Sequence, residues 1–167
     1  MLETLDSIKK ADMINKQLEA HVREQPLNVY IQLNTSGEDN KAGLTPPKDD
    51  EGDKGEAVAL ALHIVQECPH VRLLGLMTIG SFEHSHAEGT RNPDFVALVE
   101  AREKLVAALK KAGVESGKVG REGEQWRLEL SMGMSADFAE ALKEGSDSVR
   151  VGTRCVPQES CGADRSG

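Results

Sequence analysis

The chain is poor in aromatic residues and in cysteine. Phenylalanine, tyrosine and tryptophan make up 3% of its 167 residues, which is too few for a surface that stacks nucleic-acid bases. The three cysteines, Cys68, Cys155 and Cys161, do not form a disulfide framework, and none belongs to a spacing typical of zinc sites. We therefore expect a reducing, cytoplasmic setting, with a mitochondrial one as the alternative, no metal site, and Cys68 as a thiol in the core.

Long apolar runs and positive net charge are lacking as well. No stretch approaches the roughly 18 apolar residues of a membrane-spanning helix, and the first residues lack the basic start and apolar core of a signal peptide. The formal net charge of −8 argues against nucleic acid and anionic membrane surfaces as partners. With so few aromatic side chains, the core has to be built from Leu, Val, Ile, Ala and Met.

What the chain does have is an alternation of helical and strand periods. The predicted helices cover residues 6–22, 57–68 and 93–112. The predicted strands cover residues 28–34, 71–77, 128–132 and 148–151. We expect Asn92 to cap the third helix and Pro93 to open it. This order predicts an α/β fold with parallel strands and helical crossovers, and it leaves open a doubly wound sheet or part of a (β/α)8 barrel.

The last part of the chain has the pattern of an anion-binding cup. A turn at Gly133 follows a buried strand, and Ser135 is predicted as the N-cap of a short helix that ends at Gly145. The next strand ends in Gly152 and the hydroxyl of Thr153. Backbone N–H groups, two hydroxyls and a helix N-terminus would then meet at one phosphate. Taken singly, a cap serine and a turn glycine predict only local structure.

Four segments in collinear order resemble the pyridoxal-phosphate homeostasis protein family, formerly called the proline synthetase co-transcribed homologues. The segments are Glu3–Ala11, Asn28–Leu44, Leu73–Gly80, and the pair Leu-Ser-Met-Gly-Met-Ser-Ala-Asp and Gly-Ser-x-x-Val-Arg-Val-Gly-Thr within residues 130–153. The resemblance implies a TIM-like barrel of the alanine racemase N-terminal domain type, here incomplete at about strands 4 to 8. It covers residues 1–153 as a partial barrel domain that binds pyridoxal phosphate (PLP). Residues 154–167 depart from the family and are expected to form a disordered tail.

The resemblance also implies a cofactor site at the strand ends. Ser135 and Thr153 match phosphate contacts, together with the backbone around Met134 and Gly152. Arg150 matches the arginine that faces the pyridine nitrogen of the cofactor. A cation there disfavours protonation of that nitrogen and weakens the ring as an electron sink, which suits a carrier or a racemase better than an aminotransferase.

Three further side chains have two interpretations each. Met132 and Met134 could line the cofactor pocket, although methionine often fills gaps in a core. Asn34, at the end of a strand, could reach the cofactor or hold a loop. The segment that carries the Schiff-base lysine in the family has no match in this sequence. Lys41 is the nearest local substitute, and a surface lysine is the preferred interpretation of it.

Three functions from different classes remain open. We expect a non-enzymatic, monomeric PLP-binding protein of vitamin B6 homeostasis, whose partners are PLP and the PLP-dependent apoenzymes. An amino-acid racemase would need a catalytic lysine and an opposing tyrosine, and the one tyrosine, Tyr30, lies in a predicted strand. The third possibility is a truncated product without cofactor function, since five strands of a barrel leave open sheet edges.

Overall fold

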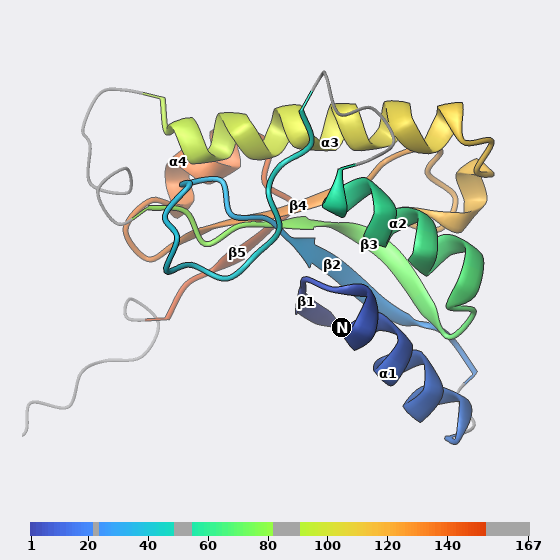
Figure 1. Ribbon diagram of the computed structural model, residues 1–167. Coiled ribbons are helices and arrows are strands. Elements are labelled where there is room, and N and C mark those ends of the chain that lie inside the picture. Colours follow the sequence, from blue (N-terminus) through green and yellow to red (C-terminus); the bar gives the residue numbers. More distant parts are fainter. Residues whose placement is uncertain (22–23, 49–54, 82–90, 153–167) are drawn as a thin grey trace, which may run out of the picture.

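Five parallel strands form one curled sheet in the computed structural model, which describes residues 1–21, 24–48, 55–81 and 91–152 (Figure 1). The strands are β1 (Leu2–Leu5), β2 (Leu27–Gln32), β3 (Val71–Met77), β4 (Glu129–Met134) and β5 (Ser148–Arg150). The helices are α1 (Ile8–Glu19), α2 (Glu56–Glu67), α3 (Pro93–Lys111) and α4 (Phe138–Lys143), with a short 3-10 turn η3 (Ser116–Lys118). The predicted tail, residues 154–167, lies outside the described residues. Among the described helices, none is long and apolar enough to cross a membrane.

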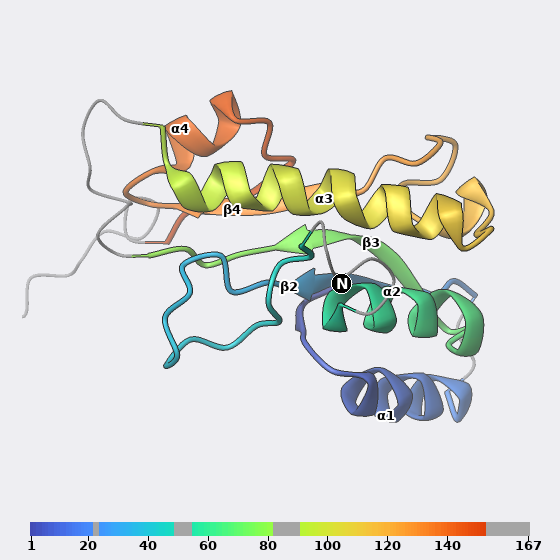
Figure 2. The same ribbon diagram turned by 45° about the horizontal axis from the view of Figure 1, so that its top comes forward.

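The strands pair in the order β1-β2-β3-β4-β5, which is also their order in the sequence. Because each crossover leads to the next strand in the same direction, the right-handed rule places the helices on one face of the sheet. Figure 2 shows α1, α2, α3 and α4 following one another across the sheet. A doubly wound sheet would require a reversal of strand order, so the sequential order favours the curled, half-barrel arrangement.

The core lies between the sheet and the helices. Alternate residues of the strands, such as Val29, Leu73 and Leu130, are fully buried in one cluster with Ala61 of α2 and Leu105 of α3. The other residues of the strands point to the opposite face, which carries most of the polar groups of the sheet. This division follows from the two-residue period of a strand, and it decides which side chains are available to a ligand.

Most predicted boundaries agree with the structure. The continuous apolar run predicted as a strand over residues 71–77 is β3, with the same bounds. Asn92 caps α3 as predicted, since its side chain accepts a hydrogen bond from the N–H of Asp94 at 2.9 Å, and Pro93 is the first helical residue. The first predicted helix, over residues 6–22, is shorter in the structure: its cap is Ser7, whose hydroxyl accepts a hydrogen bond from the N–H of Lys10, and it ends at Glu19.

The short helix after β4 differs from the prediction. Asp137, and not Ser135, occupies the N-cap position of α4. β4 continues through Gly133, which has a φ of +93°, as far as Met134. The predicted end of the helix is confirmed: Gly145 has a φ of +90°, and the N–H of Ser146 donates to the carbonyl of Ala141 at 2.9 Å, as in a Schellman motif.

Candidate functional site

Arg150 is held at the carboxyl edge of the sheet by groups from other strands. Its Nη1 donates to the hydroxyl of Ser131 on β4 at 2.7 Å, and its Nη2 donates to the carbonyl of Thr78, just after β3, at 2.7 Å. Nη1 also lies 3.8 Å from a carboxylate oxygen of Glu3 on β1. The side chain of Arg150 is 28% exposed. The guanidinium is therefore fixed in position while part of it still faces solvent.

Glu3 and Ser131 complete this network. Ser131 is fully buried, and its hydroxyl donates to Glu3 Oε2 at 2.7 Å while it accepts from Arg150. Burial lowers the pKa of the Arg150 guanidinium from its ordinary value, and the negative charges of Glu3 and Asp137 oppose that effect. An arginine stays charged in proteins, so the edge carries a fixed positive charge with nearby carboxylates.

The predicted phosphate contacts meet in part. The N–H of Gly152 donates to Ser135 Oγ at 3.1 Å, so the two strand ends approach each other as expected. The N–H of Met134 donates to the carboxylate of Asp137 at 2.7 Å and is not a free donor. Thr153 lies outside the described residues. The cup therefore consists of Ser135 and Gly152, without the helix N-terminus that the prediction included.

The room beside these two residues suits a phosphate. Gly152 is exposed, and a Cβ placed on it would have no atom of the described residues within 4 Å. Ser135 is partly exposed, and its hydroxyl proton is not required by the hydrogen bond that it accepts from Gly152. An anion at this point could accept from both groups at once. In this respect, the residues that are present fit the phosphate of PLP.

Met132, Asn34 and Lys41 have structural roles. Met132 is fully buried in the core beneath the helices, so the expectation that it lines the pocket is corrected. The side chain of Asn34 donates to the carbonyl of Glu38 at 2.8 Å and accepts from the hydroxyl of Ser36, so it holds the loop after β2. Lys41 Nζ contacts Glu38 at 2.6 Å and the carbonyl of Gly80 at 2.8 Å. Lys41 is therefore more than a surface residue, because its side chain links this loop to the segment after β3.

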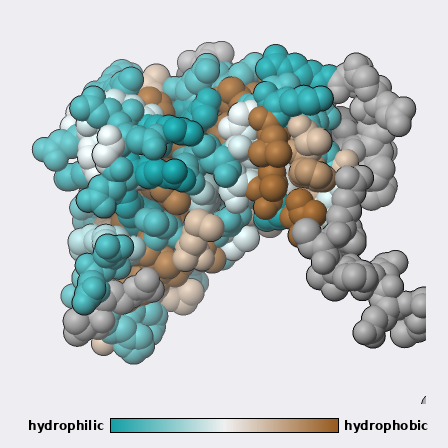
Figure 3. All heavy atoms as spheres, turned by 180° about the vertical axis from the view of Figure 1, so that it is seen from behind, coloured by the Kyte–Doolittle hydropathy of each residue, from teal (hydrophilic) through white to brown (hydrophobic). Residues whose placement is uncertain are grey.

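A second polar network lies toward the amino ends of the strands. The hydroxyl of Tyr30 donates to Glu129, which also pairs with Arg121 at 2.6 Å. Burial and the neighbouring Glu129 raise the pKa of Tyr30 well above its ordinary value. The side chains of Tyr30 and Glu129 border a hollow of about 670 Å³ on the face opposite the helices. Arg72 and Leu74 also line this hollow. Seen from behind, the molecular surface is largely hydrophilic, with one strip of hydrophobic residues and smaller hydrophobic patches elsewhere on this face (Figure 3).

Sequence reasoning did not assign a role to Glu3 or Thr78. The sequence gives no clear signal for β1, because its four residues are too few to show an alternation of apolar and polar positions. The pairing register shifts between Leu2 and Leu5, which both pack against the core, so the two-residue period of a strand could not have placed Glu3 on the opposite face. Thr78 contributes its backbone carbonyl to Arg150, and a backbone group leaves no mark in the sequence.

Comparisons with known proteins agree with this fold. The family model described as alanine racemase, N-terminal domain, matches residues 1–156. The pyridoxal phosphate homeostasis protein of Homo sapiens is 42% identical over 153 residues, which are 92% of this chain and 48% of that protein. The protein of the same name from Schizosaccharomyces pombe is 45% identical over 152 residues, 91% of this chain and 53% of that protein. The chain thus spans about half the length of these curated relatives.

A solved structure is similar over the same region. PipY of Synechococcus elongatus PCC7942, without PLP, has a TM-score of 0.63 at 24% sequence identity and is matched over 91% of this chain and 59% of its own. The structure of PipY with PLP bound has a TM-score of 0.59 at 23% identity, over 91% of this chain and 58% of its own. At these identities the likeness concerns the fold. Because the family model matches almost the whole sequence, this chain belongs to the alanine racemase N-terminal domain family.

Proposed function

We propose that this chain binds PLP without catalysing a reaction and takes part in the homeostasis of the cofactor. The observation that carries the proposal is the arrangement at the carboxyl edge of the sheet, where the fixed guanidinium of Arg150 lies on the strand that leads to Gly152 and Ser135. The similarity to proteins named for PLP homeostasis supports the same function. In this proposal the five strands correspond to about strands 4 to 8 of a (β/α)8 barrel.

The phosphate group would be held by Ser135 and Gly152. The Ser135 hydroxyl and the Gly152 N–H would both turn from each other to the anion, since each can donate one hydrogen bond. A hydrogen bond to a charged group contributes about 1.5–3 kcal/mol. Thr153 would add a second hydroxyl, as the resemblance implies. Arg150 provides the positive charge that balances the ligand.

Arg150 would also set the chemistry of the bound ring. When bound, PLP supplies an aldehyde and an electron-accepting pyridine ring. Arg150 keeps a positive charge beside the position that the resemblance gives to the pyridine nitrogen, and it is held there by Ser131 and the Thr78 carbonyl. A fixed cation disfavours a proton on that nitrogen. This arrangement suits a carrier or a racemase better than an aminotransferase, so the choice between the first two rests on other residues.

The contacts of Tyr30 argue against the racemase alternative. A racemase needs a tyrosine that can take and give a proton at the substrate, and Tyr30 is 1% exposed with its hydroxyl bound to Glu129. Its raised pKa makes the phenolate harder to form. We propose that this chain holds PLP through its phosphate, at Ser135 and Gly152, and not through an imine.

The remaining parts of the proposal concern partners and location. We infer that the chain acts as a monomer in the cytoplasm and that PLP-dependent apoenzymes receive the cofactor from it. The net charge of −8 supports the exclusion of nucleic acid as a partner.

A titration with PLP, pyridoxal and inorganic phosphate tests the proposal. We expect PLP to bind at one site, inorganic phosphate to compete with it, and pyridoxal to bind at least about tenfold more weakly. Ser135→Ala should lower the affinity for PLP by about tenfold or more, because the phosphate loses a hydrogen bond. Ser116→Ala, in the turn η3, is the matched control. Equal affinities for PLP and pyridoxal would overturn the phosphate site.

Two further measurements separate the alternatives. Reduction with borohydride followed by peptide mapping should give no stoichiometric lysine adduct, and such an adduct at one lysine would refute the absence of a native imine. Incubation of the PLP-loaded chain with L-alanine should leave its configuration unchanged on chiral chromatography. Appearance of D-alanine above the rate of free PLP would support the racemase instead.

A further inference from the structure

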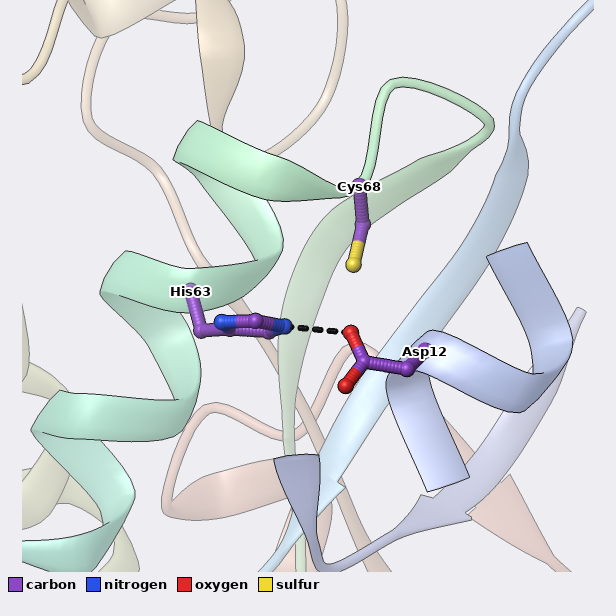
Figure 4. Close-up of side chains that lie close together, drawn as sticks. All are labelled: Asp12, His63 and Cys68. Carbon is purple, nitrogen blue, oxygen red and sulfur yellow. Dashed lines mark hydrogen bonds and ion pairs between the residues drawn. The ribbon is translucent and has the colours of Figure 1, made fainter. Parts of the chain in front are cut away.

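Three side chains with metal-ligating atoms meet in the helix layer, away from the cofactor site. Asp12 lies on α1, His63 on α2, and Cys68 at the C-cap of α2. Figure 4 shows the Cys68 sulfur and the His63 ring directed toward the carboxylate of Asp12. His63 Nε2 lies 2.6 Å from Asp12 Oδ1, and the three ligand atoms all lie within 4.8 Å of one another. One sulfur, one nitrogen and one oxygen ligand are thus close enough to share an ion.

The fold determines this meeting. Asp12 follows Ala11, the fully buried residue of α1, so it stands at the margin of the packed face. His63 precedes the buried Ile64, and Cys68 ends the same helix with its N–H bonded to the Ile64 carbonyl at 3.2 Å. His63 and Cys68 therefore come from consecutive turns of α2 and face the neighbouring helix. The sequence did not indicate the cluster, because Asp12 is far from the other two residues along the chain.

The burial of the three groups differs in a way that suits a metal at a margin of the core. Cys68 is 2% exposed, while the His63 and Asp12 side chains are 23% and 56% exposed. The sulfur would thus lie at the inner end of the site, and the carboxylate would lie at the solvent end, where a water molecule could complete the coordination. A buried thiol in the hydrophobic core needs no polar neighbour, yet this one faces an ion pair.

The donor set selects the class of metal. Thiolate sulfur favours zinc and copper(I) over calcium, magnesium and manganese, while imidazole and carboxylate are common ligands of zinc. Three protein ligands with a water molecule in the fourth position are a known arrangement for zinc. A thiolate and a carboxylate together would also balance the charge of a divalent ion.

We propose that Asp12, His63 and Cys68 bind one zinc ion, with water as the fourth ligand. Zinc–ligand bonds of about 2.0–2.3 Å place tetrahedral ligand atoms about 3.3–3.6 Å apart. The nitrogen–oxygen pair would have to open from 2.6 Å, while the sulfur already lies within 4.8 Å of both atoms. When zinc binds, the Cys68 thiol releases its proton to solvent, and the proton that His63 Nε2 shares with Asp12 also leaves that nitrogen for solvent, while the ring keeps or takes a proton on Nδ1.

The zinc ion would act as a clamp between α1 and α2. In α1, Ala11 is the fully buried residue, and Met13 is 59% exposed, so this helix is anchored by few side chains. A metal ion with ligands on both helices would add a strong link at the place where packing is sparse. The competing interpretation is an ion pair between Asp12 and His63 beside a core thiol, without a metal.

Metal titration of the full chain distinguishes the two interpretations. After treatment with a chelator, we expect equilibrium dialysis to show one zinc ion per chain in a background with Cys155→Ser and Cys161→Ser, which removes the other thiols. Cobalt(II) used as the probe should give the charge-transfer absorbance of a thiolate ligand, and zinc should displace it. Zinc should also raise the melting temperature, because it binds the folded state only.

Single variants then assign the ligands. Cys68→Ser should abolish the charge-transfer band. Asp12→Asn and His63→Gln should each lower the affinity for zinc by more than about 100-fold, since loss of a group that only supports a ligand already lowers metal affinity by about 10- to 100-fold. Asp12→Asn keeps a side chain of the same shape and so tests binding in a folded chain. Glu19→Gln, at the end of α1, is the control. Absence of zinc binding in the background chain, or equal binding by Cys68→Ser, would overturn the proposal in favour of the ion pair.

Discussion

Substitution of Gly133 tests how the chain forms the edge that carries the candidate site. Gly133 lies within β4 with a φ of +93°, and an added Cβ would lie 2.5 Å from the Cβ of Ala141 and 3.2 Å from the Cα of Phe138. Carbon atoms in good contact are about 3.5–4.0 Å apart. Alanine at this position would therefore meet two penalties at once, namely a left-handed backbone and a collision with α4.

The two penalties can be estimated separately. A left-handed conformation costs about 1–2 kcal/mol for a residue with a side chain, and overpacking in a core costs about 1–3 kcal/mol. Gly133→Ala should thus lower the free energy of unfolding by about 2–5 kcal/mol. Because the collision pushes α4 away from β4, it should also separate Ser135 from Gly152.

Gly145→Ala is the matched control for Gly133→Ala. Gly145 has a φ of +90°, but no atom of the residues that the structure describes would lie within 4 Å of an added Cβ. Gly145→Ala has the same backbone penalty as Gly133→Ala and the same effect on the unfolded chain. It should therefore lower the free energy of unfolding by only about 1–2 kcal/mol. Urea denaturation followed by circular dichroism measures both variants. Equal destabilisation of the two would refute the argument that contact with α4 makes Gly133 necessary.

Three other perturbations have definite expected outcomes. Tyr30→Phe should lower the free energy of unfolding in urea by about 1–3 kcal/mol, because the buried carboxylate of Glu129 loses a donor; an unchanged value would mean that water replaces the hydroxyl. Arg150→Lys should cost about 1–3 kcal/mol in the same assay, since an ammonium lacks the planar fork that reaches both acceptors. Arg91 holds the pKa of Glu144 below its ordinary value. The pair therefore stabilises the fold at pH values above the pKa that Glu144 has in the unfolded chain, and this stabilisation is lost as the pH falls through its pKa in the folded chain. When the pH is lowered from about 5 to about 3, the melting temperature of Glu144→Gln should therefore fall less than that of the parent protein. Equal falls in the two proteins would contradict this reasoning.

The elements with strong local signals were predictable from the sequence. β3 is a continuous apolar run, and the start of α3 combines a capping side chain at Asn92 with proline at the next position. Gly145 was predictable because its place at the end of a helix requires a left-handed backbone. In each case a few adjacent residues contain the whole physical reason for the structure.

The parts that were not predictable depend on distant residues. Ser135 has the local pattern of an N-cap, but its hydroxyl is used by Gly152, and Asp137 takes the cap position. Met132 differs from these cases, because it alternates with Leu130 toward the helices and this local period already favours a core position. The surroundings of Arg150 come from three strands, and only the assembled sheet brings them together.

The link between Glu3, Ser131 and Arg150 has a consequence for the order of events during biosynthesis. Glu3 and Ser131 are 128 positions apart, and Arg150 follows Ser131 by 19. Each strand–helix unit before them can form from neighbouring residues as the chain leaves the ribosome. The link closes a loop of 128 positions, and the entropy of that closure is offset only once the intervening strands are in place. Arg150 therefore becomes fixed only after the strands that hold it are in place, and the proposed anion site is complete only in a chain whose synthesis has passed β5.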